Sequence, residues 1–235
     1  MNEKTQTVDR LLRQLEAAAE LRHSIRADAE TAAARQRLRA WQAARLARTH
    51  ADLLASPHTG PAAAFFLTDL YGPVDLGDLA DDVKRIVPVM ARLLPAAALE
   101  TVADAIELDA LSEDLDTRMT AALGRKTAAL DAAGYGRAYR TVGRRPERER
   151  QIDLIGDLGG ALGRFVHQPL ISYTLTLMRQ PARIAGLGRL QDFLERGYAA
   201  FGKMERVEDF LDPIVERERK LMEALFVGDD SLLEA

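Results

Sequence analysis

Cysteine is absent from the 235 residues, which excludes disulfides, thiolate catalysis and cysteine-ligated zinc or iron–sulfur centres. No run of apolar residues approaches the roughly 18 residues that a membrane-spanning helix needs. The first ten residues are polar and lack the apolar stretch of a secretory signal. From these absences we expect a cytoplasmic protein with no membrane span.

The common catalytic signatures are missing as well. The chain contains no G-x-x-x-x-G-K-[ST] phosphate loop, no G-x-S-x-G nucleophile elbow and no H-E-x-x-H metal motif. Glu20 and His23 form a lone E-x-x-H, whereas a di-iron bundle needs two such motifs. We therefore predict no catalytic residue and no metal ligand, and a non-enzymatic protein is favoured.

What the sequence does contain is typical of helices. Alanine and leucine, two strong helix formers, are abundant, and 47% of the residues are apolar. Apolar side chains recur at helical spacing, most regularly between Leu211 and Phe226, and no alternating pattern of strand type is present. The prediction is an all-α protein, a bundle of about eight or nine helices with a long N-terminal helical arm.

The clearest break in the chain is the Pro- and Gly-containing segment 56–61. It divides an N-terminal arm, residues 1–56, from a helical bundle, residues 61–228, and a short tail, residues 229–235, follows Gly228. Within the bundle, a helix is predicted over 96–123, with an apolar stripe toward the core and its acidic residues on the other side.

Charge alternates along the chain. Residues 10–48 are basic, residues 75–116 hold eleven acids against three bases, and residues 137–150 hold six arginines against two glutamates. Such alternation favours pairing within the molecule or between subunits over nucleic-acid binding, which needs an uncancelled basic face. The alternative for the second basic segment is an anion or partner site, because arginine forks suit carboxylates and phosphates. Its candidate residues are Arg137, Arg140, Arg144, Arg145 and Arg148.

Four glycines stand inside a predicted helix between Gly156 and Gly163. Each costs about 1 kcal/mol relative to alanine, so close approach of a second helix or of a flat ligand is expected in return. The run Leu154–Gly160 resembles the glycine-rich distal helix of haem oxygenases. That resemblance implies haem held by His23 as axial ligand, with Gly156, Gly159 and Gly160 against the porphyrin.

A second resemblance involves the run Phe65-Phe66-Leu67-Thr68-Asp69-Leu70-Tyr71-Gly72-Pro73. It is similar to a signature of uncharacterised bacterial all-helical proteins, which also show motifs like Ala138–Arg140 and Met178–Ala182. The resemblance implies a helical fold and supplies no activity.

Two functional hypotheses follow. The first is a non-enzymatic interaction or regulatory protein, a homodimer whose arm and charged segments contact the partner, with no cofactor. The alternative is a haem-binding or haem-degrading protein of haem-oxygenase-like type.

Overall fold

The computed structural model describes residues 3–26, 28–70, 77–93 and 96–234. Within these ranges the chain forms eleven α-helices and no strand. The all-α prediction is therefore confirmed, and the predicted number of eight or nine helices was too low. The α-helices are α1 (Glu3–Arg26), α2 (Ala29–Thr49), α3 (Ala51–Ala55), α4 (Gly60–Phe65), α5 (Gly77–Leu93), α6 (Ala96–Leu123), α7 (Ala132–Val142), α8 (Arg145–Val166), α9 (Pro169–Ile184), α10 (Gly188–Phe201) and α11 (Glu208–Val227). Short π- or 3-10-helical segments cover 66–70, 124–129 and 231–233.

Capping residues set the starts of two of the helices. Asp28 accepts hydrogen bonds from the backbone N–H groups of Glu30 and Thr31, both at 3.2 Å, and so starts α2 as a new helix. Asp131 does the same for α7 by accepting from the N–H of Gly134 at 2.7 Å. An aspartate side chain competes with the preceding helical hydrogen bonds, so each position favours the start of a new helix.

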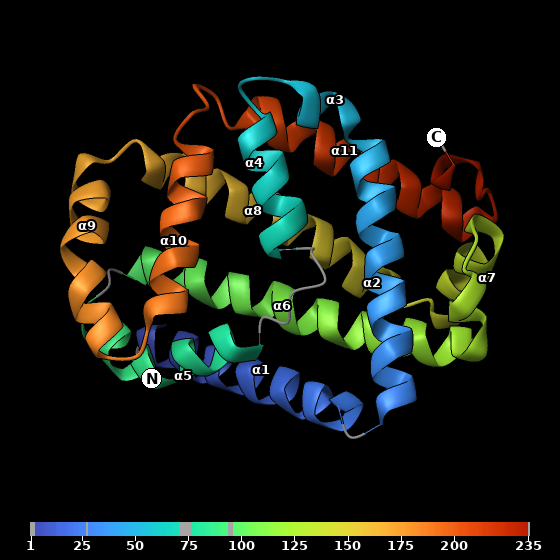
Figure 1. The fold of residues 1–235 in the computed structure, drawn as a ribbon, viewed down its shortest axis with the longest axis horizontal. Helices are drawn as coiled ribbons and strands as arrows, with labels where there is room; N and C mark the ends of the chain where they lie inside the picture. The colour runs from blue at the N-terminus through green and yellow to red at the C-terminus, as the bar shows by residue number, and fades with distance from the viewer. Residues whose placement is uncertain (1–2, 27, 71–76, 94–95, 235) are drawn as a thin grey trace.

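α1, α6, α8 and α11 run roughly along the long axis of the molecule (Figure 1). α1 packs on α6, α6 on α8 and α8 on α11, so that these helices form successive layers. α2, α4 and α10 cross this stack, and α9 stands at one end beside α10. None of the described helices is long and apolar enough to cross a membrane.

The predicted N-terminal arm belongs to the core. Leu11 and Leu15 of α1 are buried in one cluster with Val83 and Val87 of α5 and with residues of α6. In α2, Leu38 is buried in a second cluster with residues of α6, α7, α8 and α11. The apolar stripe of this segment thus meets other helices of the same chain, and the expectation of an extended arm is corrected.

The chain end also packs inward. Leu233, in the segment predicted as a tail, is buried in the same cluster as Leu38. Next to it, Asp230 accepts hydrogen bonds from the guanidinium of Arg140 at 2.7 and 3.3 Å. This ion pair fastens the chain after α11 to α7.

The two phenylalanines of the bacterial signature lie in the core. Phe65 packs against Phe193 of α10 at a ring-centroid distance of 5.3 Å, and Phe66 packs edge-on against Phe210 of α11 at 6.3 Å. The last three signature residues, 71–73, lie outside the described residues. The described part of the signature therefore serves packing.

Candidate functional site

The acidic side of α6 faces α1 and α2. Arg10 of α1 contacts Glu100, Asp104 and Glu107 at 2.7, 3.0 and 3.0 Å, one carboxylate per helical turn or less. The prediction that charges of opposite sign pair within the molecule is confirmed. The expectation that these acids lie on the side away from the packed surface is corrected, because arginines of the predicted arm cover them.

Glu113 is the centre of this charge network. Its side chain is 1% exposed and pairs with three guanidinium groups, those of Arg22 at 3.3 Å, Arg39 at 2.6 Å and Arg35. Two neighbouring acids also pair with these arginines: Asp109 with Arg22 at 2.6 Å and Asp116 with Arg39 at 3.1 Å. The network joins α1, α2 and α6 through hydrogen-bonded ion pairs, which is how charges are tolerated in an interior.

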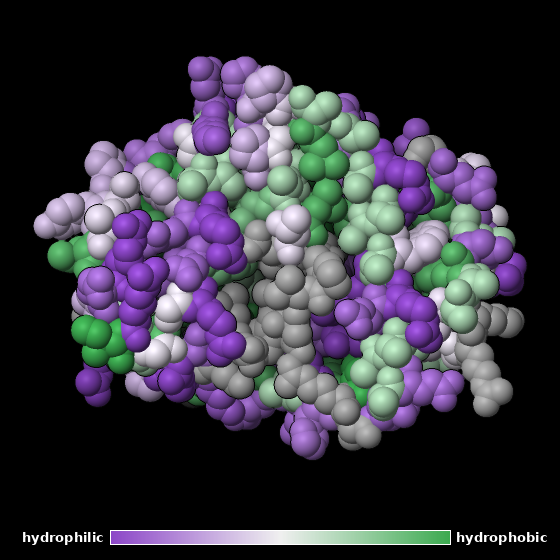
Figure 2. All heavy atoms as spheres, in the orientation of Figure 1, coloured by the Kyte–Doolittle hydropathy of each residue, from purple (hydrophilic) through white to green (hydrophobic). Residues whose placement is uncertain are grey.

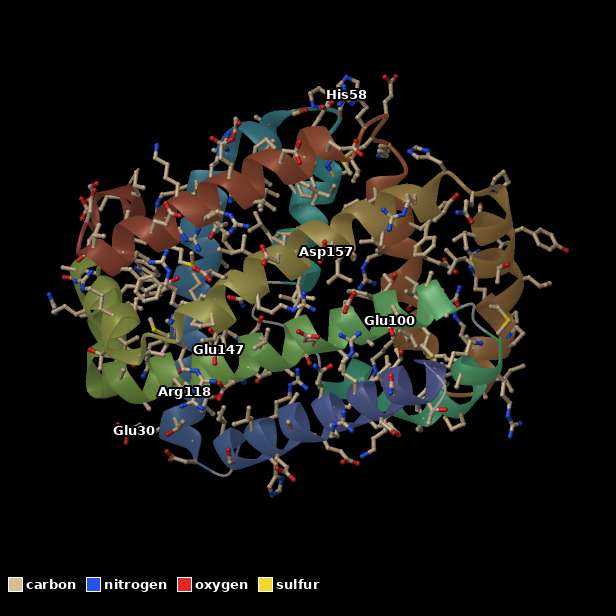
Figure 3. The ribbon with its side chains drawn as sticks, turned by 180° about the vertical axis from the view of Figure 1, so that it is seen from behind. Glu30, His58, Glu100, Arg118, Glu147 and Asp157 are labelled. Carbon is tan, nitrogen blue, oxygen red and sulfur yellow. The ribbon has the colours of Figure 1, made fainter. Side chains whose placement is uncertain are left out.

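Two arginines of the second basic segment, residues 137–150, pair with glutamates three or four residues away in the sequence. Arg144 contacts Glu147 at 2.7 Å and Arg145 contacts Glu149 at 2.8 Å, both on α8. Figure 3 places Glu147 next to Arg118 of α6, so the start of α8 sits in a mixed-charge surface cluster. Arg150 reaches the acidic segment at Glu107.

The five candidate arginines are therefore not brought together. Arg140 belongs to the pair with Asp230, Arg144 and Arg145 lie in surface pairs, and Arg137 is exposed on α7. Arg148 differs from the other four because it points inward and is 6% exposed.

Arg148 lines a cavity of about 170 Å³ between α2, α6, α7, α8 and α11. Its Nε donates to the carbonyl oxygen of Gly143 at 2.9 Å, and its guanidinium lies 3.5 Å from the ring centroid of Tyr139. Burial raises the pKa of Tyr139 above its usual range, although the positive charge of Arg148 opposes the rise. The tyrosine is thus a neutral platform for the arginine at any ordinary pH.

A second buried pair lies on another wall of the cavity. Glu218 of α11 accepts from Arg45 of α2 and lies 3.1 Å from Nε2 of His50. Burial opposes ionisation of this carboxyl, but the charge of Arg45 and the hydrogen bonds from His50 and Arg45 prevail, and the pKa falls to about 2. Glu218 is accordingly ionised at neutral pH.

The glycines of α8 lie against α11. A Cβ at Gly159 would stand 2.2 Å from Cδ2 of Leu211, and one at Gly163 would stand 2.5 Å from Cγ1 of Val207. Close helix approach therefore accounts for these two glycines. At Gly160 a Cβ would meet only Nη1 of Arg164, at 3.7 Å, so this position is not part of the contact.

His23, the proposed haem ligand, is exposed on α1. The haem hypothesis places Gly159 and Gly156 against the porphyrin, but Gly159 faces the side chain of Leu211. A Cβ at Gly156 would lie 3.4 Å from Cγ2 of Val215. The haem hypothesis stays a prediction.

Replacing Gly159 with leucine should lower the free energy of unfolding by about 1–3 kcal/mol, because the new side chain overfills the α8–α11 contact. Gly160→Leu is the matched control on the adjacent residue and should cost much less, since it removes a helix-interior glycine and its Cβ would meet only the flexible end of Arg164 at ordinary contact distance. Urea denaturation followed by circular dichroism measures both. Equal losses for the two variants would contradict the assignment of the contact to Gly159.

An exposed apolar stripe runs along α9. Tyr173, Leu177 and Ile184 are 65%, 60% and 86% exposed, and Met178 stands beside them. Figure 2 shows separate hydrophobic residues, among hydrophilic ones, at the end of the molecule where α9 lies. This stripe was not predicted from the sequence, because Pro169 and Pro181 interrupt the segment. The usable signal was the spacing of four residues from Tyr173 to Leu177 and of seven from Leu177 to Ile184, in a segment without charged residues from Pro169 to Met178.

The fold and these contacts define the chain as an all-α bundle with a buried ion-pair network and a small internal cavity. A family model described as a domain of unknown function, DUF8198, matches residues 21–232. Because the match covers most of the chain, the chain belongs to this family. No curated protein and no solved structure matches it.

Proposed function

We propose that this protein is a non-enzymatic helical interaction protein that self-associates through the exposed stripe of α9. The observation that carries the proposal is the size and regularity of that stripe. A single exposed apolar residue on a protein surface is ordinary, whereas several on one helix face are typical of an interaction surface.

The spacing of the stripe suits pairing of helices. Tyr173, Leu177 and Ile184 fall on the a and d positions of a heptad pattern. Gln180 occupies the a/d position between Leu177 and Ile184. A polar residue at one seam position favours a defined register over loose association. Each α9 would thus offer the other a narrow apolar seam with one internal hydrogen-bonding group.

We expect a second copy of the chain to bind the stripe, because no unpaired charge among the residues beside it opposes a symmetric contact. A two-fold symmetric interface brings the same patch onto itself, so unpaired like charges along its borders oppose it. The residues beside the stripe include Ser172, Thr174 and Thr176, which are uncharged. The two arginines of α9 are engaged by α10, Arg179 with Glu195 at 2.8 Å and Arg183 with Asp192 at 3.6 Å.

The double variant Leu177→Glu, Ile184→Glu should be monomeric where the wild-type protein is dimeric. Like charges would face each other across the symmetric interface, and both residues are exposed enough for the fold to be kept. Sedimentation velocity gives the mass, and circular dichroism checks the helix content. Val227→Glu alters an apolar residue that is 83% exposed on α11 and should leave the dimer intact. A dimeric double variant would show that α9 is not the interface.

A further inference from the structure

The cavity behind α2 and α7 has a mostly apolar wall. Its apolar lining residues include Leu115 and Met119 of α6, Ile152 of α8 and Leu221 of α11. At about 170 Å³ it is smaller than the roughly 300–1,000 Å³ pockets that hold drug-sized ligands. An apolar cavity of about 150 Å³ engineered in another protein holds benzene. The volume therefore limits an occupant to about the size of one small ring.

The acidic groups on the cavity wall are already neutralised. Asp116 accepts from Nε of Arg39 and from Nε2 of Gln42, both at 3.1 Å. Asp109 accepts from Arg22 at 2.6 Å, and Glu218 accepts from Arg45. A negatively charged ligand would therefore meet no uncompensated carboxylate among the described lining residues.

Arg148 has spare hydrogen-bonding capacity in this cavity. Its Nε is used by the carbonyl of Gly143, but its Nη2 is buried and has no hydrogen-bond partner among the described residues. Leaving a charged donor unsatisfied in an interior costs free energy, so the arrangement favours an acceptor that enters from the cavity. The stacking of the guanidinium on Tyr139 holds it in place for such a contact.

We propose that the cavity is a binding site for a small monocarboxylate with a compact apolar body. The carboxylate accepts from Nη2 of Arg148, and the apolar body lies among the side chains of α6, α8 and α11. A charge-assisted hydrogen bond of this kind is stronger than a neutral one, and the paired acids leave the positive charge of Arg148 as the attractive feature of the wall. The proposal does not depend on self-association through α9.

Benzoate is a probe of the required size and charge, and the chain carries its own reporter. Trp41, the only tryptophan, stacks on the cavity residue Tyr135 at a ring-centroid distance of 4.5 Å. Titrating the full-length protein with benzoate should change the tryptophan fluorescence saturably and raise the melting temperature. Benzamide, neutral and nearly identical in shape, should bind at least tenfold more weakly, and inorganic phosphate should have no effect.

Two variants complete the test. Arg148→Met keeps an unbranched apolar stem but removes the guanidinium and its charge, and it should weaken benzoate binding at least tenfold. Arg145→Met removes an exposed arginine three residues away and should bind benzoate like the wild type. Absence of a saturable benzoate response in folded wild-type protein would overturn the proposal, as would equal affinities for benzoate and benzamide. The benzamide comparison needs no variant, so the test stands even if Arg148→Met does not fold.

Discussion

Replacing Glu113 with alanine should lower the free energy of unfolding by about 3–5 kcal/mol, which is typical of removing one partner from a buried ion pair. Glu113 is the carboxylate on which Arg22, Arg35 and Arg39 converge. Without it the network has three guanidinium groups against Asp109 and Asp116 in a place from which water is largely excluded. Since typical domains are stable by only about 5–15 kcal/mol in total, this loss is a large fraction of the stability.

Asp114→Ala provides the matched control on the adjacent residue. Asp114 is a partly exposed carboxylate of the same helix and pairs with Arg118 at 2.8 Å on the surface. Exposed pairs contribute about 0–1 kcal/mol, so this variant should be nearly as stable as the wild type. Urea denaturation gives both values. A loss below about 1 kcal/mol for Glu113→Ala would show that the network is not the electrostatic centre of the fold.

Acidification should remove about 3 kcal/mol of stability through Glu218 alone. Its pKa is about 2 in the folded protein and 4.5 without the surrounding structure, and each pKa unit is equivalent to about 1.4 kcal/mol. Because the folded-state pKa is the lower one, the stabilisation is complete above about pH 4.5. It is lost progressively as the pH falls from there toward 2.

The contribution of Glu218 can be separated from that of other carboxylates by a difference measurement. The free energy of unfolding is measured between pH 6 and pH 3 for the wild type and for Glu218→Gln, which keeps the shape of the side chain. The wild type should be more stable at pH 6, and the difference should shrink toward pH 3. A difference that is constant across this range would contradict the lowered pKa.

The fold class could be predicted from the sequence because helical periodicity and composition are local properties. The helix 96–123 was predicted with the bounds that α6 has in the structure. The sequence left open whether residues 5–56 form one helix or two, since a capping aspartate such as Asp28 cannot be told from an exposed aspartate within a helix by residue type alone. The burial of the apolar residues of α1 and α2 was also missed, because the sequence of an apolar stripe does not show which other helix packs against it.

The candidate site was predicted only in part. Charge complementarity was visible in the sequence, but the convergence on Glu113 depends on how α1 packs along α6 and how α2 crosses it, which no spacing rule provides. Among the five arginines, only the three-dimensional arrangement distinguishes Arg148, which faces the cavity, from its exposed neighbours. The glycine pattern indicated a close approach, and the structure locates it at Gly159 and Gly163.

The most direct test of the central claim is site-specific cross-linking, which the absence of cysteine makes clean. Gln180→Cys places one thiol within the proposed seam of α9, and Glu30→Cys places one at the opposite end of the molecule (Figure 3). With a short bis-maleimide reagent at micromolar protein, the Gln180→Cys variant should form a covalent dimer and Glu30→Cys should remain monomeric. Equal yields of dimer from the two variants, or none from Gln180→Cys, would contradict self-association through α9.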